Sequence, residues 1–274
     1  PLLLLAGAAE AQPVLAFLST PMNLLLLKLV LSPLLLLMAT LAVRRWGAAV
    51  GGLLVGLPLT SGPVSIFLAL ERGPDFAFNA TSGSLAATTG QVAFALAYSA
   101  LAGKGWMAAM SGAGVAFLAV SACLQYSGFN QSILFLIAVL AALLSLRLIP
   151  RSPAAIRPAR APWWDLPARI VIMAALVVGV TSAAGHIGPG PAGVIASFPF
   201  MAAVLGGFAH HAEGAQAARL VMRGLCAGLL GFAVFFYIVS LTVQTQPYSL
   251  VYGGAILCAL ISQAMALRLI RVAR

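Results

Sequence analysis

Long, nearly uninterrupted apolar runs separated by short polar connections extend along almost the whole chain. A helix needs about 20 apolar residues to cross the hydrocarbon core of a bilayer. Because the runs are continuously apolar and do not alternate, they predict membrane helices and exclude a membrane β-barrel. The expected spans are residues 24–43, 48–70, 77–102, 106–124, 132–149, 169–186, 189–209, 217–242 and 249–267.

Two segments interrupt this pattern and divide the chain. Residues 1–21 could form a tenth span, the remainder of a signal peptide, or residues that precede a native start at Met22. Residues 150–168 are rich in proline and arginine and form the one substantial loop. The chain then divides into 22–149 and 169–274 on either side of that loop. The predicted fold class is an all-α, polytopic membrane protein with nine or ten transmembrane helices.

The composition agrees with this fold class and excludes others. Hydrophobic residues make up 62% of the chain and charged residues 7%, whereas soluble domains carry about 25% charged residues. The net charge of +10 would suggest nucleic-acid binding in a soluble domain. In a membrane protein the same excess indicates orientation, because basic residues collect in cytoplasmic loops. We therefore expect membrane lipids as partners and no nucleic acid.

The basic residues test the predicted topology. If the connection with Arg44 and Arg45 is cytoplasmic, only Lys28 and Arg72 fall on the opposite side. The other cytoplasmic residues are then Lys104, Arg147, Arg151, Arg157, Arg160, Arg169, Arg219, Arg223, Arg268, Arg271 and Arg274. This strong asymmetry predicts a protein of the bacterial inner membrane with a cytoplasmic C-terminus.

An internal repeat emerges when the sequence is shifted along itself by 141 residues. Glycine, proline and phenylalanine coincide at Gly47/Gly188, Gly52/Gly193, Pro58/Pro199, Phe67/Phe208, Gly73/Gly214, Gly83/Gly224, Gly90/Gly231 and Phe94/Phe235. The composition predicts about one such coincidence, so the pattern indicates a duplication. The shift equals five predicted spans, an odd number, and the two repeats should therefore have inverted topology. Inverted repeats are a frequent build of secondary transporters.

Proline interruptions at equivalent positions of the two repeats point to a substrate cavity. Pro58 and Pro63 should kink or break the span 48–70 near the middle of the bilayer, and Pro199 is central in its own span. A polar face on span 77–102 should point toward the protein interior. The cavity candidates are Pro58, Thr60, Ser61, Ser65, Ser84, Thr88, Gln91, Tyr98, Ser197 and Pro199. The alternatives are kinks that only shape packing and polar side chains that only form interhelical hydrogen bonds.

Ionisable side chains close to the spans are few. Glu71, near the outer end of its span, and His210, His211 and Glu213, at the inner end of the equivalent span, could titrate during proton-coupled transport. The alternative for all four is an ordinary solvated loop. His186, the remaining histidine, belongs to the opposite face, so we expect no metal site. Catalytic and phosphate-binding motifs are absent from the sequence, so neither an enzyme nor a cofactor is expected.

Nine or ten short-looped helices in two inverted halves resemble the drug/metabolite transporter superfamily. The run Gly56-Leu-Pro-Leu-Thr-Ser-Gly-Pro63 is also similar to segments of uncharacterised bacterial inner-membrane proteins. The resemblance implies a secondary transporter for a small or amphipathic metabolite. Two other hypotheses stay open: a flippase for lipids or lipid-linked intermediates, and a non-transporting subunit of a membrane complex.

Overall fold

A computed structural model describes residues 21–58, 61–150, 167–168, 170–172, 174–175 and 198–272. Within these ranges all regular structure is helical. The predictions for residues 1–20, Thr60, residues 151–166 and Ser197 lie outside the described residues.

The helices follow one another through short connections. Their bounds are α2 (Pro21–Trp46), α3 (Ala48–Val55), α4 (Ser61–Arg72), α5 (Pro74–Leu101), the 3-10 turn η1 (Ala102–Lys104), α6 (Trp106–Gln125), α7 (Gln131–Leu148), α10 (Phe200–Glu213), α11 (Ala215–Thr242) and α12 (Tyr248–Val272). Five segments are long and apolar enough to cross a membrane: α5 with η1, α6, α7, α11, and α12 as far as Ala266. These five confirm the helices expected at 77–102, 106–124, 132–149, 217–242 and 249–267.

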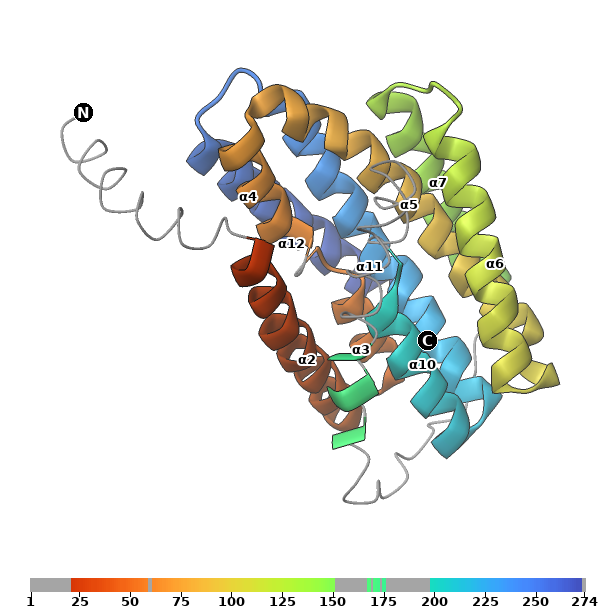
Figure 1. The fold of residues 1–274 in the computed structure, drawn as a ribbon. Helices are drawn as coiled ribbons and strands as arrows, with labels where there is room; N and C mark the ends of the chain where they lie inside the picture. The colour runs from red at the N-terminus through yellow and green to blue at the C-terminus, as the bar shows by residue number, and fades with distance from the viewer. Residues whose placement is uncertain are drawn as a thin grey trace.

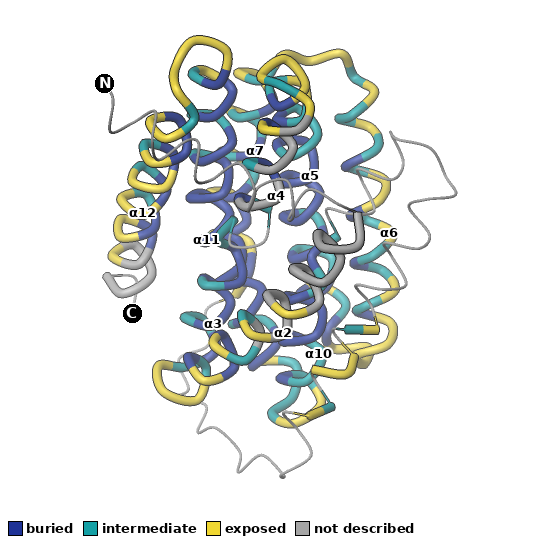
Figure 2. The backbone as a smooth tube through the Cα atoms, turned by 60° about the vertical axis from the view of Figure 1, so that its left-hand side comes forward, coloured by how far each residue is buried: buried dark blue, intermediate teal, exposed yellow. Residues whose placement is uncertain are grey.

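Helices α5 and α11 form the centre of the bundle and run antiparallel to each other (Figure 1). Contacts at both ends of the pair establish this direction. Asp75, at the start of α5, meets Gln244 just beyond α11, whereas Ser99, near the end of α5, meets Arg219 near the start of α11. Both helices are mostly buried, whereas α6 and α12 turn one face outward (Figure 2).

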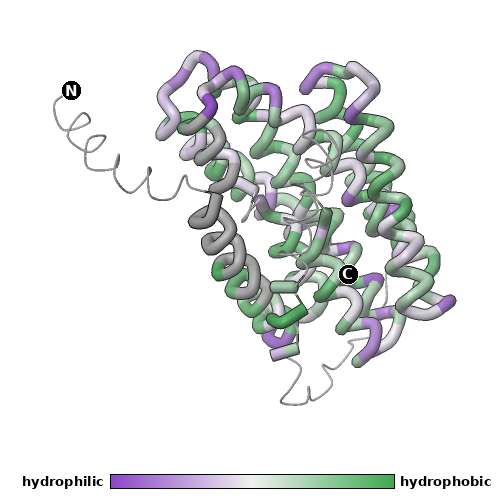
Figure 3. The backbone as a smooth tube through the Cα atoms, viewed as in Figure 1, coloured by the Kyte–Doolittle hydropathy of each residue, from purple (hydrophilic) through white to green (hydrophobic). Residues whose placement is uncertain are grey.

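The outward faces of α6, α7 and α12 are apolar. Large exposed side chains on them include Val115, Leu140, Leu144, Leu257 and Leu260. Hydrophilic residues collect at the two ends of the bundle, and hydrophobic residues occupy the length of the helices between them (Figure 3). This arrangement matches a bundle whose sides face hydrocarbon and whose ends face water.

Basic residues gather at one end of the bundle. This end is formed by the end of α2, η1, the end of α7 and the start of α11 (Figure 1). The described cations there are Arg44, Arg45, Lys104, Arg147, Arg219, Arg223 and, beyond the last apolar turns of α12, Arg268. Arg72 lies at the opposite end, where α4 leads into α5. We call these the basic end and the opposite end.

The span expected at 48–70 is divided into two helices, as its prolines predict. Helix α3 ends at Val55 and α4 begins at Ser61. Pro58 has no N–H with which to continue α3. Pro63 lies in the first turn of α4, where an N–H has no helical acceptor, and α4 therefore continues through it.

Helix boundaries coincide under the 141-residue offset. Helix α5 shifted by 141 residues gives 215–242, the bounds of α11, and the end of α4 at Arg72 falls on the end of α10 at Glu213. The connecting glycines share one conformation, with φ 85° and ψ 173° at Gly73 and φ 86° and ψ −179° at Gly214. This region of backbone space is essentially restricted to glycine.

Candidate functional site

The break between α3 and α4 is built by local hydrogen bonds around Pro58. The N–H of Leu57 donates to the carbonyl of Leu54 at 3.1 Å, a tightened final turn. On the other side of the break, the N–H of Gly62 donates to the carbonyl of Pro58 at 2.8 Å and starts α4. Pro58 thus ends one helix and supplies the first acceptor of the next.

The tightened turn frees the carbonyl of Leu53, and a distant glutamine binds it. In a regular helix this carbonyl would accept from the N–H of Leu57. Instead, Gln263 of α12 donates its Nε2 to the Leu53 oxygen at 2.9 Å. Gln263 is buried, and its Oε1 has no hydrogen-bond partner among the described residues. One carbonyl freed by the break is therefore bound by the protein itself.

Helix α3 lies against α11 through two pairs of glycines, each spaced by four. A Cβ on Gly52 would lie 2.1 Å from the carbonyl oxygen of Val221, and one on Gly224 would lie 2.0 Å from that of Ala49. Gly56 and Gly228 meet backbone to backbone one turn further along. These G-x-x-x-G faces allow the close approach typical of packed membrane helices. The broken helix is thereby fixed to the central helix of the other half of the chain.

The start of α10 shares one hydrogen bond with the start of α4. Pro199 caps α10, and its carbonyl accepts from the N–H of Ala203 at 2.9 Å. This bond is the counterpart, under the 141-residue offset, of the bond between Gly62 and Pro58. The preceding Phe198 packs edge-on against Phe94 of α5 and Phe117 of α6, with ring centroids 5.6 and 5.4 Å apart.

The polar face predicted on α5 points inward, but two of its hydroxyls bond within their own helix. Thr88, Gln91 and Tyr98 are buried, and Ser84 is half-buried. Ser84 donates to the carbonyl of Ala80 at 3.3 Å, and Thr88 donates to that of Ser84 at 2.7 Å. Such bonds satisfy a hydroxyl proton without a partner helix.

The remaining described candidates form separate contacts. Ser65 of α4 lies 3.1 Å from the hydroxyl of Tyr252 of α12, which also donates to the Ser65 carbonyl at 2.9 Å. Ser61 is half-buried at the start of α4. The candidates are thus distributed over the α4–α12 contact, the face of α5 and the contact between α5 and α10.

Tyr98 and His210 form the contact between α5 and α10 at the basic end. The Tyr98 hydroxyl lies 3.2 Å from Nδ1 of His210, and the rings meet edge-on with centroids 5.9 Å apart. Arg219 of α11 donates its Nε to the carbonyl of Ser99, beside Tyr98, at 3.0 Å. His210 lies beyond the five candidate spans. Burial, followed by the positive charge of Arg219, lowers its pKa below the usual 6.5.

The other ionisable candidates lie at the ends of the half-helices. His211 is exposed and Glu213 is half-buried in the last turn of α10. Glu71 occupies the last turn of α4, next to Arg72, whose guanidinium lies 5.2 Å from the ring centroid of Phe76. Among the described residues, no three His, Cys, Asp or Glu side chains are grouped closely enough to hold a metal ion.

Arg223 is buried, although its sequence position predicted only a cation in a cytoplasmic connection. Arg223 of α11 donates its Nη1 to the carbonyls of Leu146 and Ile149 at the end of α7, the latter at 3.0 Å. A cation bound to the last carbonyls of a helix stabilises its C-terminus. The signal that could have identified Arg223 is its position inside an apolar run, two turns into the span.

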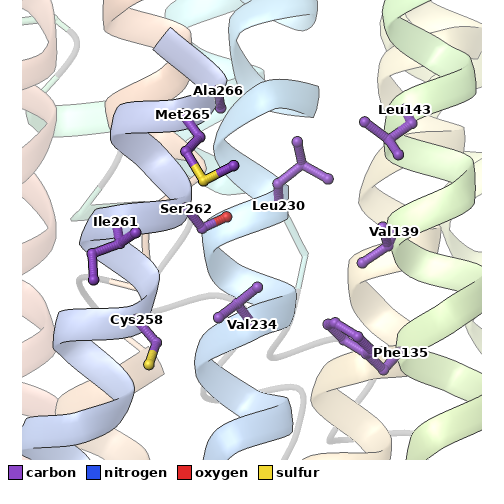
Figure 4. A pocket seen from close by; sticks show the side chains of 10 residues that line it. All are labelled: Phe135, Val139, Leu143, Leu230, Val234, Cys258, Ile261, Ser262, Met265 and Ala266. Atoms are coloured by element: carbon purple, nitrogen blue, oxygen red, sulfur yellow. The ribbon is translucent and has the colours of Figure 1, made fainter. Parts of the chain in front are cut away.

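An apolar groove of about 440 Å³ opens between α7 and α12, with α11 as its floor (Figure 4). Its walls face each other across Leu230 and Val234 of α11. The residues that line it are Phe135, Val139, Leu143, Leu230, Val234, Cys258, Ile261, Ser262, Met265 and Ala266. The groove runs along two candidate membrane spans, on a side of the bundle that would face a surrounding bilayer.

Comparison with known proteins identifies no relative: no family model, no curated protein and no solved structure matches this chain. The class defined by its own features is an all-helical protein with several helices able to cross a membrane.

Proposed function

We propose that the protein is a secondary transporter that moves a small or amphipathic metabolite by alternating access of two inverted repeats. The observation that carries the proposal is the equivalence of Pro58 and Pro199 under the 141-residue offset: each carbonyl accepts a hydrogen bond from the N–H four residues later, at the start of α4 and of α10. Secondary transporters build their substrate sites at paired, interrupted helices of this kind. The architecture resembles the drug/metabolite transporter superfamily.

The exchange of contacts between the two halves supports the inverted repeat. Helix α4 packs on α12 through Ser65 and Tyr252, and its counterpart α10 packs on α6, where Gly207 lies beside Met110. Each of these two short helices therefore contacts a helix of the other half in addition to the next helix of its own half. A rocking motion of one half against the other would open one end of the α5–α11 pair while closing the other end.

The chemistry of the interior favours an uncharged or amphipathic substrate. The buried and half-buried polar side chains of α4, α5 and α12 include the hydroxyls of Ser61, Ser65 and Thr88 and the amides of Gln91 and Gln263. Glu71, His210, His211 and Glu213 remain the candidates for proton coupling. We further propose that the basic end faces the cytoplasm of a bacterial inner membrane and that the C-terminus lies on the same side, because basic residues collect in cytoplasmic segments.

Spin labels at the two ends of the α5–α11 pair would test alternating access without a known substrate. Asp75 and Gln244 are an exposed pair at the opposite end, and Lys104 with Gln216 is the matched pair at the basic end. Cysteines would be introduced at one pair at a time, after replacement of Cys123, Cys226 and Cys258. Distances measured by pulsed electron resonance in nanodiscs should show two populations at each end.

The decisive comparison uses a protein with both cysteine pairs, in which the pair at one end is cross-linked first and the pair at the other end is then spin-labelled. Locking the short distance at one end should shift the other end to its long distance, because the two halves rock as rigid units. A single short distance at both ends, unchanged by either lock, would overturn the transporter proposal. That result would favour a non-transporting subunit of a membrane complex.

A lipid flippase is the second candidate, because the groove between α7 and α12 runs along two candidate membrane spans, on a side of the bundle that would face a surrounding bilayer. A flippase would move a fluorescent phospholipid between leaflets of proteoliposomes. A transporter of soluble metabolites would leave that lipid in place and would release an entrapped solute instead. The two assays on one preparation separate these functions.

A further inference from the structure

Two exposed arginines lie beyond the same end of the groove, one on each of the helices α7 and α12 that form its walls. On α7, Val139 and Leu143 line the groove, and Arg147 follows Leu143 by four residues on the same helical face. On α12, Ile261 and Met265 line the groove, and Arg268 follows Met265 by three. Leu143 and Met265 lie at the same end of the groove (Figure 4).

The position of this pair along the membrane normal matches a lipid headgroup. Arg147 lies in the last turn of its candidate span, and Arg268 lies just beyond its span, which ends at Ala266. At 1.5 Å per residue, each arginine is about 3 to 6 Å further along its helix than the last groove residue, Ala266 on α12 and Leu143 on α7. Long arginine side chains at helix ends extend toward the interface, where phosphates lie.

We propose that this surface is a binding site for one anionic phospholipid of the leaflet at the basic end. An acyl chain occupies the apolar groove over Leu230 and Val234, and the phosphate lies between Arg147 and Arg268. Charge complementarity selects an anionic lipid, because the two cations lie beyond one end of a groove that is lined almost entirely by apolar side chains. The site does not depend on the transport function, since it lies on the outer face of the bundle.

Native mass spectrometry of the purified full chain tests the site with two probes, phosphatidylglycerol and phosphatidylcholine with identical acyl chains. The wild type should retain one phosphatidylglycerol in preference to phosphatidylcholine. The double variant Arg147→Gln with Arg268→Gln should lose affinity for phosphatidylglycerol on the order of 30-fold, given two interfacial cations. Both arginines are exposed, so the fold should be preserved.

Matched variants separate this site from general effects. Arg45→Gln with Lys104→Gln removes two exposed cations from the same end, away from the groove, and should leave the lipid preference unchanged. Leu143→Trp narrows the groove and should weaken binding of both lipids. Leu144→Trp, on the neighbouring exposed position outside the groove, should not.

Three outcomes would overturn the proposal. Equal retention of the two lipids by the wild type would show that charge does not select the occupant. An equal loss in the Arg45/Lys104 control would assign the preference to the overall charge of the basic end. A dimer that Leu143→Trp dissociates, with no lipid retained, would assign the groove to a second copy of the chain.

Discussion

At the scale of single residues, His210 links the charge state of the protein to the contact between α5 and α10. Its Nδ1 faces the Tyr98 hydroxyl at 3.2 Å, and Arg219 lowers its pKa in addition to burial. Two further ionisable residues lie on the same helix as His210: the exposed His211, its neighbour in sequence, and Glu213. Protonation of His210 would place a second cation near Arg219 and make both ring nitrogens donors, so that Nδ1 could no longer accept from the Tyr98 hydroxyl.

We expect acid to weaken the fold through His210. Because the pKa of His210 is lowered in the folded protein, the unfolded chain takes up this proton first as the pH falls. The contribution of neutral His210 to the free energy of unfolding is therefore fully present above about pH 6.5, the usual pKa of histidine. This contribution is lost as the pH falls below that value. The melting temperature in detergent between pH 8 and 5 should fall less steeply for His210→Gln than for the wild type.

His211→Gln is the matched control, since it removes an exposed histidine one position away. It should retain the wild-type pH dependence. If His211→Gln and His210→Gln flattened the profile equally, the effect would belong to the net charge of α10 and not to the Tyr98 contact.

The sequence predicts part of the polar interior at this scale. The expected inward face of α5 agrees with the burial of Thr88, Gln91 and Tyr98. The sequence pattern does not identify the hydrogen bond of Gln263 to α3 or that of the buried Arg223 to α7. Gln263 binds a carbonyl that only a break 210 residues earlier makes available, and Arg223 binds carbonyls that exist only where α7 ends. Partners of this kind depend on tertiary structure, which a linear pattern does not contain.

At the scale of the helices, the contact between α3 and α11 depends on the absence of side chains. Gly224→Ala would place a Cβ 2.0 Å from the carbonyl oxygen of Ala49, a backbone atom that cannot rotate away. The two helices would have to separate, which costs about 1–3 kcal/mol for overpacking of this kind. Thermal unfolding in detergent should detect the loss as a lower melting temperature.

Gly254→Ala provides the control for the intrinsic effect of alanine in a helix. A Cβ on Gly254 of α12 would meet no atom within 4 Å. Since alanine favours helix by about 1 kcal/mol over glycine, this variant should be neutral or more stable. A Gly224→Ala protein as stable as the Gly254→Ala protein would show that α3 and α11 are not closely packed.

The elements themselves were largely predictable. Pro58 predicts the interruption of the span 48–70, because a residue without an N–H cannot continue a helix. The close glycine contact between α3 and α11 was not predicted, although both G-x-x-x-G patterns are present in the sequence. Glycines are common in membrane helices, so the pattern alone does not indicate which two faces meet.

At the scale of the whole molecule, the proposed duplication requires equivalent contacts at the two ends of the bundle. Gly207 of α10 lies beside Met110 of α6, because a Cβ on Gly207 would lie 3.5 Å from the Met110 methyl group. Under the 141-residue offset with the halves exchanged, the equivalent pair is Ile66 of α4 and Val251 of α12. The neighbouring contact of Ser65 with Tyr252 brings these two helices together.

Two cysteine pairs therefore test the symmetry of the molecule. In a background without native cysteines, a short bifunctional thiol reagent should join G207C to M110C and I66C to V251C at similar rates, because equivalent helix contacts should have equivalent spacing. The first pair lies toward the basic end and the second toward the opposite end. If the halves exchange conformations, each cross-link should trap a different state, in which spin labels at the end without the cross-link are at the long distance. Rapid cross-linking of only one pair would contradict two equivalent halves. The same trapped state from both cross-links would contradict an exchange of conformations between them.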